Sequence, residues 1–175
     1  TEAEFDLLVA DIQKNKPRGI VLDLRNNPGG YLTAAVDIAG FFMKKGELVT
    51  TVRYNDRQEL EHSDGPAQLG GIHTVVLING GSASASEILA GALQDGKLAT
   101  IIGERSYGKG TVQELMEFGD GSTLKLTVAE WLTPKGKTIE ANGITPDIEV
   151  HTSDSDRAAK IDTQLQRALA EIRGQ

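Results

Sequence analysis

The chain has 175 residues, of which 39% are hydrophobic and 25% charged. This composition and length suit a single globular domain with a substantial core. The formal net charge of −7 argues against nucleic acid as a partner, because phosphate binding needs a basic surface. Cysteine is absent, which excludes disulfides, cysteine nucleophiles and thiolate metal sites.

No apolar run approaches the roughly 20 residues of a membrane helix, so we expect no membrane insertion in this segment. The sequence opens on TEAEFDLLVADIQKNK, which has no signal-peptide pattern. This opening is typical of the interior of a longer protein.

The first segment predicts an amphipathic helix, because Phe5, Leu8 and Ile12 share one helical face. Thr1 and Glu4 have the spacing of a capping box at its start. The apolar run IVLDL then predicts a buried strand, RNNPGG a turn, and residues 32–43 a second helix.

A strand is expected over residues 47–54, followed by a polar surface loop over 55–71. The strand, turn and helix pattern then recurs in TVVLI, NGGSAS and residues 84–94, and TIIG at 100–103 predicts a third buried strand. Two such units indicate an α/β layered core with a partly parallel sheet.

The C-terminal half is expected to be richer in β structure. Residues 111–118 and 122–132 alternate around GDG, which predicts an antiparallel hairpin, and turns around a short strand follow. The spacing of Ile161, Leu165, Leu169 and Ile172 predicts a terminal helix. We expect a core of residues 1–152, with residues 153–175 packed on it or extending from it.

The motif NGGSASASE offers a site for a nucleophile, because it joins a rigid strand end to the free N–H groups of a helix start. Three serines compete, Ser82, Ser84 and Ser86, and the place at the helix entrance favours Ser84. The Ala85 N–H would then donate to a developing oxyanion. Alternatively, Ser84 and Glu87 form a capping box that requires no chemistry.

A base for this serine is not found among the three histidines. His62 lies in the polar loop, His73 precedes a buried strand and His151 is in the tail, so no Ser/His/Asp arrangement is indicated.

Lys109 is the other candidate base. It stands between two glycines in SYGKGTVQE, where the backbone can pass close to another segment and turn the lysine inward. A lysine base works in its neutral form, which burial without a carboxylate partner favours. The neutral amide of Gln113 suits it as a neighbour. The alternative is a solvated lysine in a turn.

The turn RNNPGG contributes Gly29 and Gly30, whose N–H groups could form the second half of an oxyanion hole. A plain strand-to-helix turn is the alternative. A phosphate-binding loop is not supported, because neither G-x-x-x-x-G-K-[ST] nor G-x-G-x-x-G occurs. Acids and histidines show no metal-ligand spacing, so we expect neither metal nor cofactor.

Four segments resemble, in order, the motifs of the C-terminal processing peptidases, also called tail-specific proteases: IVLDLRNNPGG, VVLINGGSASASEILAGALQD, GERSYGKGTVQ and KTIEANGITPDIEV. The resemblance extends over about residues 5–150. It implies a crotonase/ClpP-like α/β core with a β-rich C-terminal half.

Residue by residue, the resemblance implies Ser84 as nucleophile and Lys109, 25 positions later, as general base. Gln113 would hold the lysine, and the N–H groups of Gly30 and Ala85 would form the oxyanion hole. Some members of the family are described with a further acid, which would be Asp95. We disfavour it, because a carboxylate near the lysine opposes a neutral base.

The resemblance also implies a metal-free serine endopeptidase that cuts protein substrates near the C-terminus, outside the cytoplasm: in the bacterial periplasm or envelope, or the chloroplast lumen. A PDZ domain is expected in the full-length protein to select the substrate, and no PDZ-like segment occurs in this sequence. Two alternatives stay open: an acyl-thioester enzyme on a related scaffold, and an inactive or gated core that binds proteins.

Overall fold

The computed structural model describes residues 2–174, with side chains from residue 4 onward. The elements, in chain order, are α1 (Glu2–Asn15), β1 (Ile20–Asp23), α2 (Leu32–Gly40), β2 (Leu48–Tyr54), β3 (Gln58–His62), β4 (Thr74–Ile78), α3 (Ala85–Asp95), β5 (Thr100–Gly103), β6 (Thr111–Glu117), β7 (Thr123–Leu132), β8 (Ile148–Glu149), α4 (Asp154–Ala159) and α5 (Thr163–Arg173).

A four-stranded parallel sheet has the order β1-β4-β5-β8. Every residue of β4 is buried, as expected for a central parallel strand covered on both faces. The predicted α/β core with a parallel sheet is therefore confirmed. Strand β8 was not predicted, because two residues are too few to display a periodicity.

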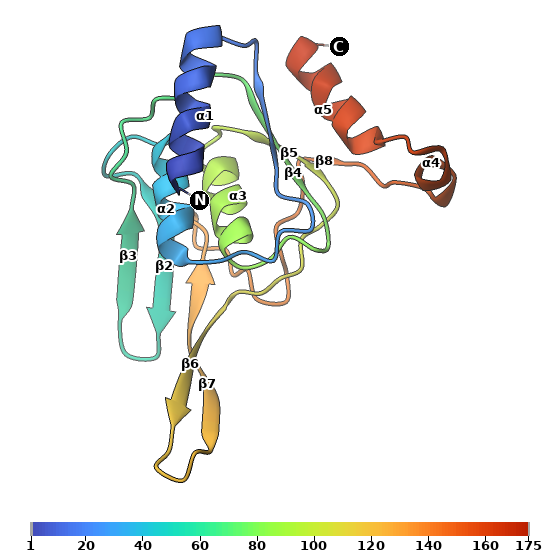
Figure 1. The fold of residues 1–175 in the computed structure, drawn as a ribbon. Coiled ribbons are helices and arrows are strands. Elements are labelled where there is room, and N and C mark those ends of the chain that lie inside the picture. The colour runs from blue at the N-terminus through green and yellow to red at the C-terminus, as the bar shows by residue number, and fades with distance from the viewer. Residues whose placement is uncertain (1, 175) are drawn as a thin grey trace.

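A second, antiparallel sheet has the order β3-β2-β7-β6, and β6 and β7 form the predicted hairpin. This hairpin projects from the body of the molecule (Figure 1). The prediction of a loop over 55–71 is wrong in part, because β3 lies inside it. Its sequence QELEH is polar because β3 is an exposed edge strand. The short strand expected after the hairpin is reduced to one bridge between Leu132 and Thr138.

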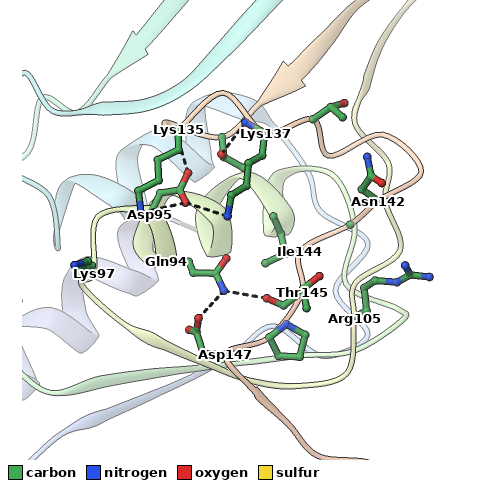
Figure 2. Close-up of a pocket in the computed structure, with 14 residues that line it drawn as sticks. Gln94, Asp95, Lys97, Arg105, Lys135, Lys137, Asn142, Ile144, Thr145 and Asp147 are labelled. Carbon is green, nitrogen blue, oxygen red and sulfur yellow. Dashed lines mark hydrogen bonds and ion pairs between the residues drawn. The ribbon is translucent and has the colours of Figure 1, made fainter.

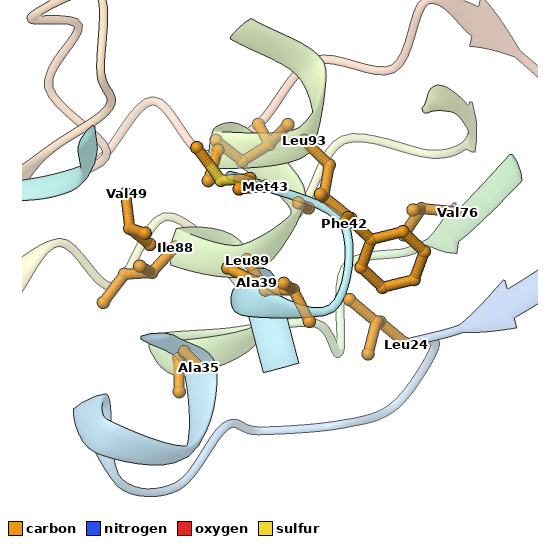
Figure 3. Packing of buried hydrophobic residues seen from close by; sticks show 14 of the residues in the cluster. Leu24, Ala35, Ala39, Phe42, Met43, Val49, Val76, Ile88, Leu89 and Leu93 are labelled. Atoms are coloured by element: carbon orange, nitrogen blue, oxygen red, sulfur yellow. The ribbon is translucent and has the colours of Figure 1, made fainter. Parts of the chain in front are cut away.

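Helix α3 lies at the centre of the largest hydrophobic cluster, and its residues from Ala85 to Leu93 are all buried. Figure 3 shows Ile88, Leu89 and Leu93 of α3 in this cluster, with Ala35 and Ala39 of α2 and with Phe42. Such close packing fixes the start of α3, which is where Ser84 lies. Helix α2 ends at Gly40 rather than at the predicted Met43.

Helix α5 covers the opposite face of the parallel sheet (Figure 1). Ala168 is fully buried against Val75, Leu77 and Ile102. The predicted apolar face is wrong for Leu165 and Leu169, which are exposed.

Polar anchoring decides the rotation of α5. Gln164 is buried, donates its side-chain amide to the carbonyl of Val150 at 2.8 Å, and accepts from Arg25 at 3.1 Å. Ile161 precedes the helix altogether, and α4 was not predicted.

Helix α1 packs through Val9, with Phe5 and Ile12 partly buried beside it, whereas the predicted Leu8 is exposed. The ring of Phe5 lies 5.2 Å from that of Phe41, measured between centroids. The proposed capping box at Thr1 falls outside the described residues.

Candidate active site

Ser84 occupies the turn between β4 and α3, with φ 56° and ψ −120°. A residue with a Cβ is strained at this positive φ, and such strain is typical of a nucleophile held on a strand-to-helix turn. The predicted capping box is present, since the Glu87 side chain accepts the Ser84 N–H at 2.8 Å. The box thus supports the strained turn, and it does not exclude a chemical role for Ser84.

The three serines of the motif differ in their surroundings. Ser82 is fully buried, and its hydroxyl donates to the carbonyl of Leu24 at 2.7 Å and accepts the Asn79 N–H at 3.0 Å. Ser86 is also buried, while Ser84 is partly exposed. The structure thereby favours Ser84 as the serine that a substrate can reach.

The RNNPGG turn lies directly against the Ser84 turn. The Asn26 N–H donates to Asn79 Oδ1 at 2.9 Å, and the carbonyl of Asn27 accepts the Ala83 N–H at 3.0 Å. At Gly29, where φ is 96°, a Cβ atom would lie 2.8 Å from the Ala85 nitrogen. Only glycine permits this approach.

The two predicted oxyanion donors have no hydrogen-bond acceptor in the described part of the chain. Among the described residues, neither the Gly30 N–H nor the Ala85 N–H donates a hydrogen bond. Two unpaired N–H groups on touching turns can bind a carbonyl oxygen as it gains negative charge.

Glu87 joins the serine turn to the lysine loop, and it is fully buried. Its Oε2 accepts the N–H groups of Ser84 at 2.8 Å and Lys109 at 2.9 Å. Its Oε1 accepts the Ser106 hydroxyl at 2.5 Å and the Gly108 N–H at 2.7 Å. One carboxyl group therefore holds the backbones of both predicted catalytic residues.

Lys109 is exposed rather than turned inward as expected from the sequence, and Gln113 is also exposed. Within the described part of the chain, Lys109 Nζ has no hydrogen bond or ion pair, and Gln113 does not bond to it. The pairing register of β6 with β7 shifts between Val112 and Gln113, where Val128 of β7 is left unpaired. The structure brings the backbones of Ser84 and Lys109 together without a side-chain bond between them.

Asp95 lies at the far end of α3, about 16 Å along the helix axis from Ser84. Its buried carboxylate accepts the Lys135 N–H at 2.9 Å and lies 3.8 Å from Lys135 Nζ and 3.9 Å from Lys137 Nζ. Figure 2 shows Asp95 among these lysines, in a pocket separate from the serine turn. Asp95 anchors the turn after β7.

A small cavity of about 120 Å³ opens beside the free N–H groups. No charged residue lines it; its walls are Leu24, Asn27, Gly29, Gly30, Tyr31, Ala34, Ala35, Ile38, Ala85, Ser86 and Leu89. It is suited to an uncharged, compact side chain.

Arg25 ties the RNNPGG turn to α5. Its guanidinium donates to Asp23 at 2.7 Å and to Asp162 at 2.8 Å. The hydrogen bond from Arg25 holds the pKa of the Asp162 carboxyl below its ordinary value. Burial alone would raise the pKa of Asp23, but hydrogen bonds from Arg25 bring it below the ordinary value.

Sequence reasoning missed the structural importance of Glu87, Asn79 and Asn26. The signal for Glu87 was present in S-x-x-E, but a local capping role explained it completely. No sequence pattern indicates that the same carboxyl group also accepts from a loop 22 residues away.

No cluster of three or more His, Asp or Glu residues with the geometry of a metal site occurs in residues 2–174. Across that same range, no helix is long and apolar enough to cross a membrane.

The sequence model of Peptidase family S41 matches residues 1–150. A carboxy-terminal-processing protease of Bartonella bacilliformis is 43% identical over 99% of this chain and 41% of the relative. A carboxyl-terminal-processing protease of Synechocystis is 44% identical, over 89% of this chain and 37% of the relative. The chain thus spans less than half the length of these relatives.

Among solved structures, the photosystem II D1 C-terminal processing protease superimposes with a TM-score of 0.81 at 37% identity, over 85% of this chain and 39% of that one.

Proposed function

The chain belongs to peptidase family S41, and we propose that it is the catalytic core of a serine endopeptidase that cuts protein substrates near their C-termini. The observation that carries this proposal is the Glu87 carboxyl group, which binds the N–H groups of Ser84 and Lys109. It fixes the two predicted catalytic residues on a common support. The protease names of the relatives favour peptide hydrolysis over the acyl-thioester alternative.

In the proposed reaction, Lys109 in its neutral form takes the Ser84 hydroxyl proton while Ser84 Oγ attacks the scissile carbonyl. The N–H groups of Gly30 and Ala85 stabilise the oxyanion. Lys109 then gives the proton to the leaving amine, and an ester on Ser84 remains. Water, deprotonated by Lys109, attacks this ester; the bond to Ser84 Oγ breaks, the new carboxyl end is released, and Lys109 returns the proton to Ser84 Oγ.

Lys109 must swing towards Ser84 for this reaction. Its exposed side chain has no bonded partner among residues 2–174, so nothing in that range has to be broken before it moves. We assign Gln113 to orient the lysine once it has turned, because a neutral amide can accept its N–H without stabilising the charged form.

The small uncharged cavity beside Gly30 and Ala85 would receive the side chain on the acyl side of the scissile bond. We therefore expect cleavage after compact apolar residues rather than after charged ones, because an unpaired charge in such a cavity is strongly disfavoured.

We also propose that the full-length protein carries a PDZ domain that selects the substrate and that it works outside the cytoplasm. The likeness to a photosystem II D1 C-terminal processing protease supports the location, whereas the PDZ domain rests on the motif resemblance described above. Fractionation of the source cells, followed by immunodetection, tests the location.

The catalytic proposal is tested by comparing the parent with Ser84→Ala and Lys109→Ala on an unfolded protein substrate. Each variant is expected to lose at least about 10³-fold in kcat/KM, because nucleophile and base act as a unit. Asp95→Asn serves as the control and should keep its activity. Unchanged turnover in Ser84→Ala or Lys109→Ala would end the proposal.

A further inference from the structure

The chain has three tyrosines, and two of them stand beside the Ser84 turn with their side chains in solvent. Tyr31 is 83% exposed and Tyr107 is 70% exposed. Neither phenol hydroxyl has a hydrogen-bond partner among the described residues. Large exposed aromatic side chains on rigid backbone are typical of binding surfaces.

Tyr31 follows Gly30 and occupies the N-cap position of α2, where it makes no side-chain cap bond. Polar residues such as serine or asparagine stabilise a helix at this position, whereas tyrosine does not. Tyr31 also forms part of the wall of the small cavity that includes Ala85 and Ser86. Its place is therefore explained by the cavity better than by helix stability.

Tyr107 lies between Ser106 and Gly108, both buried and both bonded to Glu87. Its own N–H donates to the carbonyl of Ser82 at 2.9 Å. The backbone of Tyr107 is thus fixed against the serine turn, while its side chain projects into solvent two residues before Lys109.

Tyr54, the third tyrosine, has partners of its own. The guanidinium of Arg57 lies 3.8 Å from its ring centroid, and its hydroxyl donates to Glu59 at 3.4 Å. An aromatic side chain with a partner in the fold is therefore available as an internal comparison.

We propose that Tyr31 and Tyr107 are specificity-determining residues that contact substrate side chains on opposite sides of the scissile bond. Tyr31 borders the cavity beside the oxyanion donors and contacts the residue on the acyl side. Tyr107 borders the loop of Lys109, which gives its proton to the leaving amine, and contacts the residue on the amine side. This inference rests on the proposed peptidase function.

The assignment makes a separable prediction for each residue. Tyr31→Ala should reduce the preference for leucine over alanine on the acyl side about three- to tenfold, the usual worth of one aromatic contact. Tyr107→Ala should reduce the same preference on the amine side by a similar factor. Tyr31→Phe and Tyr107→Phe should retain the parent preferences, because the ring supplies the contact.

The experiment uses four peptides that differ only in leucine or alanine on each side of one cleaved bond. Cleavage rates give kcat/KM for the parent, the tyrosine variants and the Tyr54→Ala control. Dissociation constants of the same peptides are measured by fluorescence anisotropy in a Ser84→Ala background, so that binding is read without turnover. Thermal unfolding checks that every variant is folded.

The expected result is a loss of discrimination confined to one side of the bond in each alanine variant and absent in Tyr54→Ala. Equal losses on both sides, or unchanged discrimination in cleavage and in binding, would overturn the inference while leaving the peptidase intact. If the parent neither cleaves nor binds any of the four peptides, the inference falls together with the proposed function.

Discussion

The Glu87 carboxyl group accepts four hydrogen bonds in a fully buried position. Three of its donors are backbone N–H groups, which cannot move away without breaking the loops that carry them. Such a network is rigid only while every member is satisfied. The geometry of the candidate site therefore depends on one side chain that need not touch the substrate.

Glu87→Gln is expected to destabilise the fold by on the order of 3 kcal/mol, because an amide NH₂ replaces an acceptor and faces two donors. Urea unfolding monitored through Trp131 measures this loss, and kcat is expected to fall with it. Glu140→Gln is the control, since the exposed Glu140 carboxyl group accepts a single hydrogen bond from the described residues, that of the Gly110 N–H, and should change stability by no more than about 1 kcal/mol. Equal effects of the two substitutions would contradict the role of Glu87.

Gly29→Ala is expected to lower kcat at least about tenfold, because the new Cβ would lie 2.8 Å from the Ala85 nitrogen and 2.9 Å from Ser84 Cβ. Gly46→Ala separates this contact from backbone strain. Gly46 has a similar φ of 86° with nothing within 4 Å of the added Cβ, so it should lose about 1 kcal/mol of stability and no activity. Steady-state kinetics on both variants distinguish the two causes.

At the scale of elements, Arg25 couples the RNNPGG turn to α5 through Asp162, which also accepts the Leu165 N–H at 2.9 Å as the N-cap of the helix. The C-terminal helix thus contributes to holding a turn of the candidate site. Its rotation about its axis is fixed by polar contacts of Gln164, which an analysis of apolar spacing does not detect.

The stability that the docking of α5 contributes is expected to fall at acidic pH. The pKa of Asp162 is lower in the folded than in the unfolded chain, so its stabilising contribution is complete above about pH 4 and is lost as the pH falls below that value. Asp162→Asn should therefore flatten the decline in unfolding free energy as the pH falls below about 4.

Asp64→Asn is the matched control for this pH dependence, because Asp64 is exposed and its ion pair with Lys45 is also exposed. Its unfolding free energy should follow that of the parent over the same pH range. Parallel pH curves for the parent and Asp162→Asn would refute the coupling.

At the scale of the whole molecule, the parallel sheet is covered by α2 and α3 on one face and by α5 on the other. The division at residues 152 and 153 stays a prediction. Because Ala168 packs against Val75, Leu77 and Ile102 of the parallel sheet, the last helix shares a hydrophobic cluster with the core.

A chain that ends at residue 152 is consequently expected to lose several kcal/mol of unfolding free energy, because the apolar area that α5 buries on the sheet would become exposed to water. Its urea midpoint should fall, and binding of a hydrophobic dye should rise as the sheet face is exposed. A truncated chain with the parent's midpoint would show that α5 is an independent appendage.

The sequence by itself determined the strand–turn–helix units, because buried strands such as TVVLI and turns such as NGGSAS are local patterns with local physical causes. It also singled out Ser84, Lys109 and Gln113 as candidates. The sequence pattern did not predict strand β3, because an edge strand can be polar. It also did not predict the buried face of α5, because Gln164 is buried by partners far away in the chain.

Only the tertiary structure decided which groups meet. It placed Asp95 away from the serine turn, left Lys109 and Gln113 exposed, and brought Glu87 to the loops of both Ser84 and Lys109. These contacts join residues far apart in the chain. A local sequence pattern does not indicate which distant donor will form a hydrogen bond with a given carboxyl group. The pairing of the Ser84 and Lys109 side chains stays a prediction that the kinetic variants test.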